Sequence, residues 1–201
     1  MRIDAIQKRR GRKSVLISDG AEVAVLDNEL ILLSGLREGM QIEEDALEEL
    51  IVESDQKRAR QKALWLLSKR DYAKKELILK LKQDATEESA ELAVQRMEEL
   101  GLIDDQAYAV RRAKDLFAFK AYSAEKIMYE LVRRGIDSQT AKQTVQELAP
   151  DPSERLKELI ERKYKRYLED EKGRQKVWQT LSRMGYSYSD INTALKRDEY
   201  D

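Results

Sequence analysis

The sequence predicts a mainly α-helical protein in which three tandem three-helix repeats follow a small N-terminal β-containing extension. Glycine and proline number only 8 and 2 among 201 residues, while Glu, Lys, Arg, Leu and Ala, which favour helices, are abundant. From residue 43 onward the apolar residues recur with helical periodicity, and the pattern returns after 50 residues. We expect the repeats to form an elongated, curved array.

The extension is expected to cover residues 1–56. Residues 15–17 and 23–26 are rich in β-favouring side chains and flank Asp19-Gly20, a dipeptide typical of hairpin turns. Residues 30–33 predict a short helix that ends near the next glycine, and an acidic helix completes the extension.

The repeats are visible when the chain is compared with itself after a shift of 50 residues. Two apolar positions recur in all three units: Leu77, Ile127 and Val177 at the first, and Leu81, Leu131 and Leu181 at the second. The units are predicted at residues 57–104, 105–150 and 153–197, and Pro150 and Pro152 separate the last two.

Helix starts and ends are marked at related positions. Asp104, Ser123 and Ser187 are expected N-caps, because their side chains can accept hydrogen bonds from the free N–H groups of a first helical turn. Gly135 and Gly185 suit the left-handed conformation in which many helices end.

The net charge of −1 hides strongly opposed blocks. Residues 43–55 carry seven acids and no base, whereas residues 57–82 carry ten bases and two acids. Residues 84–105 have a net charge of −7 and residues 106–134 a net charge of +4. The total therefore says little about affinity for acidic partners.

Several classes of site are excluded or disfavoured. The chain lacks Cys and His, which removes thiol chemistry and the commonest metal ligand and general base. No phosphate-binding glycine loop or nucleophile elbow is present. Asp104-Asp105 is better explained by a helix N-terminus than by a metal or acid–base pair. We expect no cofactor, no metal, no catalysis, no membrane span and a cytoplasmic location.

Basic side chains near predicted helix ends are the candidate contact residues. A row of cations along a repeat protein suits a phosphate backbone or an acidic protein groove, but a solvated face or internal pairing with the acidic blocks are the competing interpretations. The candidates are Lys69, Arg70, Lys74, Lys75, Arg111, Arg112, Arg133, Arg134 and Arg183.

Two further features allow more than one interpretation. The basic run at residues 8–13 is equally consistent with a charged hairpin edge that prevents strand pairing and with a nucleic-acid contact. The aromatic residues mostly fall on apolar helical positions, so the core is the preferred place for them; they include Trp65, Tyr108, Tyr122, Tyr164, Tyr167 and Trp178.

Several strings resemble the RecX family of bacterial regulatory proteins. The most specific is Leu-Gly-Leu-Ile-Asp-Asp-Gln-Ala-Tyr-Ala at residues 100–109. Residues 63–81, 131–136 and 181–186 resemble the family's first, second and third repeats, so the resemblance covers roughly residues 57–197. The chain departs from the family at three places. Ala73 stands where the family has a helix-capping serine, and Gln83-Asp84 stand where it has a Lys-Gly turn. Ala121-Tyr122 replace a glycine-containing turn.

The resemblance implies a function that composition does not show. RecX proteins bind the RecA filament on DNA, lie along its groove and suppress strand exchange, ATP hydrolysis and co-protease activity in DNA repair and the SOS response. It implies a monomeric, non-enzymatic inhibitor that also contacts single- or double-stranded DNA weakly. It leaves open which repeat carries the affinity and whether filaments are inhibited or stabilised.

Two other functions compete with this one. Three-helix units also serve as helix-turn-helix modules, so a protein acting directly on DNA is the alternative. An enzyme that uses carboxylates alone has the least support, because no paired-acid constellation is present.

Overall fold

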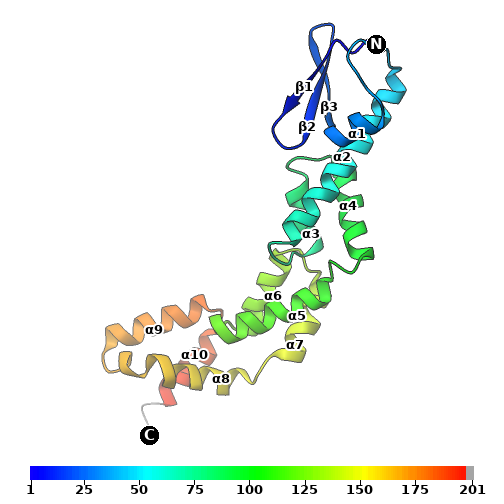
Figure 1. The fold of residues 1–201 in the computed structure, drawn as a ribbon. Coiled ribbons are helices and arrows are strands. Elements are labelled where there is room, and N and C mark those ends of the chain that lie inside the picture. The colour runs from blue at the N-terminus through cyan, green and yellow to red at the C-terminus, as the bar shows by residue number, and fades with distance from the viewer. Residues whose placement is uncertain (198–201) are drawn as a thin grey trace. The chain divides into compact units, whose positions relative to one another are not determined.

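The computed structural model describes residues 1–197 and confirms a mainly helical chain with three-helix repeats and an N-terminal sheet (Figure 1). The chain divides into two compact units, residues 1–103 and residues 104–201, which we describe separately. Within residues 1–197, no helix has the length and apolarity that a membrane crossing requires.

The first unit begins with an antiparallel sheet of three strands in the order β1-β2-β3. Its strands are β1 (Ala5–Arg9), β2 (Lys13–Ser18) and β3 (Ala21–Asp27). The predicted hairpin is confirmed: Asp19 and Gly20 both have positive φ, of 50° and 76°. Strand β1 was not predicted, because its Ala-Ile-Gln-Lys-Arg sequence is mostly polar and half-buried or exposed at an edge.

Short helix α1 (Asn28–Leu33) follows the sheet as predicted. The Asp27 carboxylate caps it by accepting from the backbone N–H groups of Glu29 and Leu30. One face of the sheet buries a compact apolar core with α1 and the following helix; this core contains Ile3, Leu16, Leu26, Ile31, Leu36, Ile42 and Leu47.

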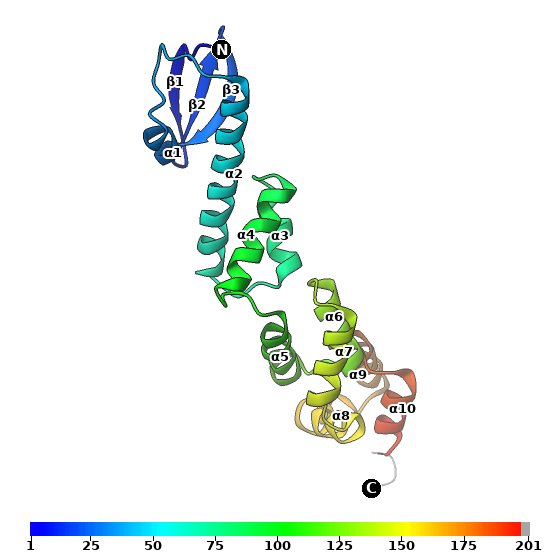
Figure 2. The same ribbon diagram turned by 90° about the vertical axis from the view of Figure 1, so that its right-hand side faces the viewer.

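Helix α2 (Glu44–Leu67) is a single element, so the boundary predicted between residues 56 and 57 is not a break in the chain. Its N-terminal half is acidic, and Glu44 and Asp45 in its first turn complement the helix dipole; its C-terminal half is basic, but its last turn carries no base. Figure 2 shows its N-terminal half beside the sheet and its C-terminal half beside α3 (Lys74–Leu81) and α4 (Glu87–Glu99).

Polar contacts hold α2 to both of its neighbours. The Ser54 hydroxyl accepts from the backbone N–H of Asp27 at 2.7 Å, and the Lys57 ammonium lies 3.0 Å from the Asp27 carboxylate. The Asp55 carboxylate accepts from the backbone N–H and the hydroxyl of Thr86, the N-cap of α4, at 2.9 and 2.8 Å. Ser54, Asp55 and Asp27 are all buried, so the joint between sheet and first repeat depends on satisfied polar groups.

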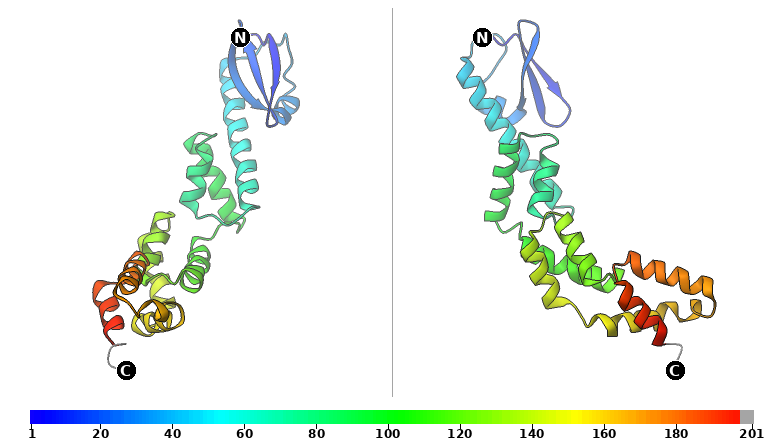
Figure 3. Two further views of the ribbon diagram at one scale, coloured as in Figure 1. Left: turned by 90° about the vertical axis from the view of Figure 1, so that its left-hand side faces the viewer. Right: turned by 180° about the vertical axis from the view of Figure 1, so that it is seen from behind.

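The second unit contains the second and third repeats (Figure 3). The second comprises α5 (Asp105–Asp115), the π-helical turn η1 (Leu116–Lys120), α6 (Ala124–Arg133) and α7 (Ser138–Leu148). The third comprises α8 (Pro152–Leu159), the π-helical turn η2 (Ile160–Tyr164), the 3₁₀ turn η3 (Lys165–Tyr167), α9 (Glu171–Arg183) and α10 (Tyr188–Arg197). The first helix of each of these two repeats, α5 and α8, therefore ends in a π-helical turn. The apolar periodicity of the sequence did not predict these turns.

The predicted caps and repeat positions are confirmed. Asp104, Ser123 and Ser187 each accept a backbone N–H three residues ahead, and Gly135 and Gly185 have φ of +98° and +93°. The six recurring apolar side chains at the two repeat positions are at most 3% exposed. The repeat therefore reflects a repeated core.

The second and third repeats are joined through backbone groups. Ser123 donates its N–H to the Met184 carbonyl at 2.9 Å and its hydroxyl to the Gly185 carbonyl at 2.7 Å. The Tyr186 hydroxyl donates to the Ala121 carbonyl at 3.1 Å, and burial raises the pKa of this phenol, which keeps it protonated. Ala121 adopts φ of +51°, a left-handed conformation at the turn where the RecX pattern has glycine.

Candidate protein and nucleic-acid interface

Four predicted contact residues lie around the turn between α2 and α3 in the first unit. Arg70 forms a two-pronged ion pair with the Glu76 carboxylate, at 2.8 and 3.2 Å, and its guanidinium lies 3.7 Å from the centre of the Tyr72 ring. Because charge, hydrogen bonding and stacking are all satisfied within the chain, Arg70 fixes this turn.

The neighbouring lysines differ from one another. Lys74, the first residue of α3, forms an ion pair with Glu98 of α4 and so ties two helices together. The Lys69 ammonium lies 5.7 Å from the centre of the Trp65 ring, and Lys75 is exposed on α3. Internal pairing with the acidic blocks therefore describes Lys74, whose partner Glu98 lies in the block at residues 84–105. Arg70 pairs instead with Glu76 of its own basic segment.

The other five predicted residues lie in the second unit. Arg111 and Arg112 are on α5, Arg133 and Arg134 are at the C-terminus of α6, and Arg183 ends α9. The Arg133 side chain is 62% exposed and donates to Glu130 at 3.0 Å, one turn earlier. Cations at helix C-termini are stabilised by the helix dipole, so these positions also have a structural explanation. The nine residues are distributed over both units.

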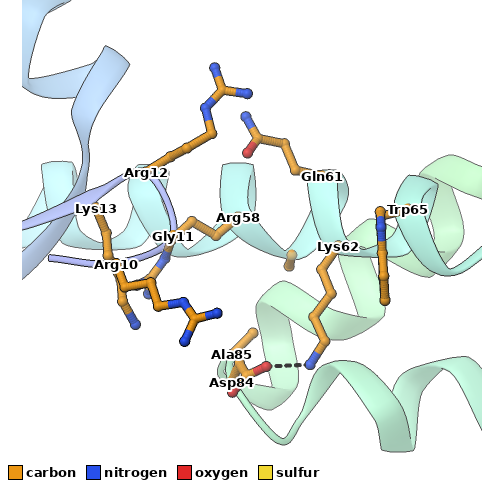
Figure 4. A pocket seen from close by; sticks show the side chains of 11 residues that line it. Arg10, Gly11, Arg12, Lys13, Arg58, Gln61, Lys62, Trp65, Asp84 and Ala85 are labelled. Atoms are coloured by element: carbon orange, nitrogen blue, oxygen red, sulfur yellow. Dashed lines mark hydrogen bonds and ion pairs between the residues drawn. The ribbon is translucent and has the colours of Figure 1, made fainter.

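A basic cleft in the first unit combines part of the basic run at residues 8–13, for which a nucleic-acid contact was one of two interpretations, with helix residues that were not predicted as contacts. It has a volume of about 560 Å³ and lies between the β1–β2 loop, the middle of α2 and the α3–α4 turn. Figure 4 shows two arginines of the loop on opposite sides of α2 in this view, with Arg12 extending toward Gln61 and Arg10 toward Asp84 and Lys62. Arg58 and Trp65 of α2 also border the cleft. Lys13, Ala59, Lys62, Asp84 and Ala85 complete its walls.

The electrostatic character of the cleft is strongly positive. Five cations line it, namely Arg10, Arg12, Lys13, Arg58 and Lys62, against the single carboxylate of Asp84. The hydrogen bond and charge of the Lys62 ammonium lower the pKa of Asp84 below its ordinary value, and the charges of Lys13 and Arg58 add to this effect. Arg58 also donates to Asp55 at 2.9 Å.

The sequence contained a signal for this cleft. Arg58, Gln61, Lys62 and Trp65 follow the spacing i, i+3, i+4 and i+7, which places them on one face of a helix. The prediction that Trp65 belongs to the core is wrong, since its side chain is 59% exposed. Ala59, Ala63 and Leu66 occupy the buried face of α2 instead. Tyr167, 46% exposed, also lies outside the core.

The described part of the chain holds no group of three or more Asp or Glu residues arranged as a metal site. Asp104 and Asp105 begin α5, and the Asp104 carboxylate accepts from the Ala107 N–H at 2.9 Å, as expected for an N-cap.

Comparison with known proteins points to the family that the sequence resembles. Residues 104–145 match the second three-helix domain of RecX, and residues 151–195 match the third. Curated proteins named "Regulatory protein RecX" align over almost the whole chain. The protein of Clostridioides difficile is 26% identical, and the alignment covers 100% of this chain and 97% of the relative. The protein of Clostridium perfringens is 27% identical over 96% of this chain and 92% of its own. Together these matches support the RecX family for this chain.

Solved RecX structures share the fold. A crystal structure of regulatory protein RecX superposes with a TM-score of 0.62 and 22% identity, covering 96% of this chain and 98% of that one. The crystal structure of RecX from Lactobacillus salivarius superposes with a TM-score of 0.60 and 24% sequence identity, covering 73% of this chain. The RecX relatives are named for regulation and not for a reaction, in keeping with a regulatory role for this chain.

Proposed function

We propose that this RecX-family protein binds the RecA filament on DNA and inhibits RecA's ATP hydrolysis, strand exchange and co-protease activity. The observation that carries the proposal is the alignment with RecX regulatory proteins over nearly the full chain, including the N-terminal extension. Because RecA works on chromosomal DNA, this role belongs in the cytoplasm.

The architecture supports a binding role spread over several contacts. Each repeat has its own buried core and presents its own exposed cations, among them Lys75, Arg111, Arg133 and Arg183. Contacts that are weak singly add up when they are linked in one chain, provided that all of them can be made at once. Successive repeats would then engage successive RecA subunits or stretches of filament DNA.

Direct binding to the filament tests the proposal. Fluorescently labelled protein is titrated with RecA filaments assembled on single-stranded DNA, with RecA alone and with the same DNA alone. We expect filaments to bind at least tenfold more tightly than either component. Tight, sequence-selective binding to DNA without RecA would instead establish the helix-turn-helix alternative.

Charge reversal tests the predicted contacts. The double variant Arg133→Glu/Arg134→Glu should weaken inhibition of RecA ATP hydrolysis several-fold, because both cations lie at the C-terminus of α6, where Arg133 is exposed and Arg134 half-buried. The control is Lys142→Glu, which alters an exposed lysine on α7 of the same unit. Equal inhibition by the double variant and the control, with both folded by circular dichroism, would rule out this surface.

A further inference from the structure

We infer that the basic cleft of the first unit holds a single strand of nucleic acid, with phosphates on the β1–β2 loop and a base stacked on Trp65. The inference rests on the proposed function, since the DNA of a RecA filament supplies such a strand. It assigns direct strand contact to the N-terminal half of the chain and, for the basic run at residues 8–13, favours the nucleic-acid contact over the charged hairpin edge.

The loop supplies the charge that the rest of the cleft lacks. On α2, Arg58 donates to Asp55 and Lys62 pairs with Asp84, so these two cations are partly neutralised within the chain. Among residues 1–197, no ion pair within 4.0 Å engages Arg10, Arg12 or Lys13. Two cations on the β1–β2 loop and a third at the start of β2, bordering a cleft with a single carboxylate, suit an extended anion with repeated charges.

The backbone holds this loop in a defined conformation. Gly11 and Arg12 have consecutive positive φ of 89° and 62°, and the Arg12 carbonyl accepts from the Asn28 N–H at 2.9 Å. A left-handed conformation is strained for a residue that carries a side chain. An arginine therefore occupies a position where glycine would be less strained, and its side chain borders the cleft and extends toward Gln61 (Figure 4).

Trp65 distinguishes a strand from other anions. Its indole borders the cleft with 59% of its surface exposed, and Gln61, one turn earlier, offers an amide that can hydrogen-bond a base edge. Bases of a duplex are already stacked on both sides, whereas an unpaired base can stack on an aromatic ring. An acidic protein surface would use the cations but would supply no ring to stack on the indole, whose contact within the chain is the Lys69 ammonium 5.7 Å from the ring centre.

The test uses the full-length protein with Trp178→Phe, which leaves Trp65 as the only tryptophan. A short oligothymidylate is titrated at low salt while tryptophan fluorescence is recorded. We expect saturable quenching by the single strand, and at least fivefold weaker quenching by a duplex of equal length.

Three variants examine the individual contacts. Arg12→Gly should weaken binding several-fold while the melting temperature holds or rises, because it removes a cation and relieves the strained φ.

Arg10→Gln/Lys13→Gln should reduce the slope of log affinity against log salt by roughly 1.4, at about 0.7 for each phosphate contact. Trp65→Leu should weaken binding about tenfold, measured by anisotropy of labelled DNA. The control is Arg96→Gln on α4, whose partner is Glu99 on the same exposed helix face.

The outcomes separate this inference from the proposed function. Unchanged Trp65 fluorescence with folded protein, or equal quenching by the duplex, would overturn the strand site while filament inhibition could persist. Loss of RecA inhibition in Arg12→Gly with unchanged oligothymidylate affinity would also overturn it and would assign the cleft to an acidic protein surface. Quenching by oligothymidylate together with absent filament binding would support the cleft and contradict the RecA proposal.

Discussion

The two joints between neighbouring substructures are built from different chemistry. In the first unit, α2 is joined to the sheet and to α4 through the carboxylates of Asp27 and Asp55. In the second unit, the second and third repeats are joined through backbone carbonyls, which accept from Ser123 and Tyr186 around Gly185. The first joint therefore depends on charge, and the second on close approach of the backbone.

This difference determines what disturbs each joint. A buried carboxylate is sensitive to protonation and to loss of its hydrogen-bond partners. A close backbone contact is insensitive to pH, but it does not tolerate an added side-chain atom. The following predictions test this contrast, from the largest expected effect to the smallest.

Gly185→Ala should cause the largest loss of stability. The added Cβ would lie 2.5 Å from Cβ of Lys126 and 2.7 Å from the Ser123 hydroxyl, at a residue with φ of +93°. Strain and overpacking together should cost about 3 kcal/mol or more in urea denaturation. Gly101→Ala is the matched control, because Gly101 has φ of +69° and open space around it; it should cost about 1 kcal/mol. Equal losses would show that the backbone contact contributes nothing.

Asp55→Ala should destabilise the first unit by about 2 kcal/mol, because it removes charged hydrogen bonds to Thr86. Asp84→Ala is the control: its carboxylate is largely exposed and pairs with Lys62, so the loss should stay below about 1 kcal/mol. Urea denaturation followed by Trp65 fluorescence measures both. A cost for Asp55→Ala no greater than the control's would contradict the carboxylate joint.

Acid should weaken the first unit more than the second. Burial alone would raise the pKa of Asp27 and of Asp55, but hydrogen bonds from Lys57 to Asp27 and from Thr86 to Asp55 outweigh it and lower both values. Because the folded pKa values are lowered, this stabilisation is present above the ordinary value of 3.8 and is lost as pH falls through the folded values.

The comparison uses two single-tryptophan proteins, Trp178→Phe to report on the first unit and Trp65→Phe to report on the second. Between pH 5 and pH 3, the urea midpoint reported by Trp65 should fall further than that reported by Trp178. The second unit also has lowered pKa values, at Asp137 and Asp151, but hydrogen bonds of fully exposed helix caps cause them. A larger fall reported by Trp178 would reverse the assignment.

Ala73→Ser should have the smallest effect and should stabilise. Ala73 occupies the N-cap of α3 in an extended conformation with no side-chain hydrogen bond, and the equivalent Ser123 caps α6. A serine at this position should add about 0.5–1 kcal/mol to the stability of the first unit. The matched change Ser123→Ala should cost more, because Ser123 also bonds Gly185. Thermal unfolding measures both; a destabilising Ala73→Ser would show that the buried site has no room for the hydroxyl.

Local chemistry made much of the fold predictable. The caps at Asp104, Ser123 and Ser187 and the helix ends at Gly135 and Gly185 depend on residues within one turn, and the recurring buried positions follow from periodicity. Strand β1 and the continuity of α2 were missed, because pairing to β2 and packing of one helix on two cores are not visible in local patterns.

The candidate site was only partly predictable for the same reason. Charge clusters marked Arg70 and Lys74, but their partners Glu76 and Glu98 were revealed only by tertiary structure. The cleft combines a loop near residue 11 with helix positions about 50 residues later, so only the fold brings them together.

RecA ATP hydrolysis on single-stranded DNA is the most direct measurement of the central claim. The intact protein is added at ratios well below one per RecA subunit, after filaments have formed. We predict that hydrolysis falls steeply at such substoichiometric ratios, because one chain that spans several subunits affects all of them. An unchanged rate at a ratio of one protein per RecA subunit, with binding to the filament demonstrated in the same solution, would contradict the account.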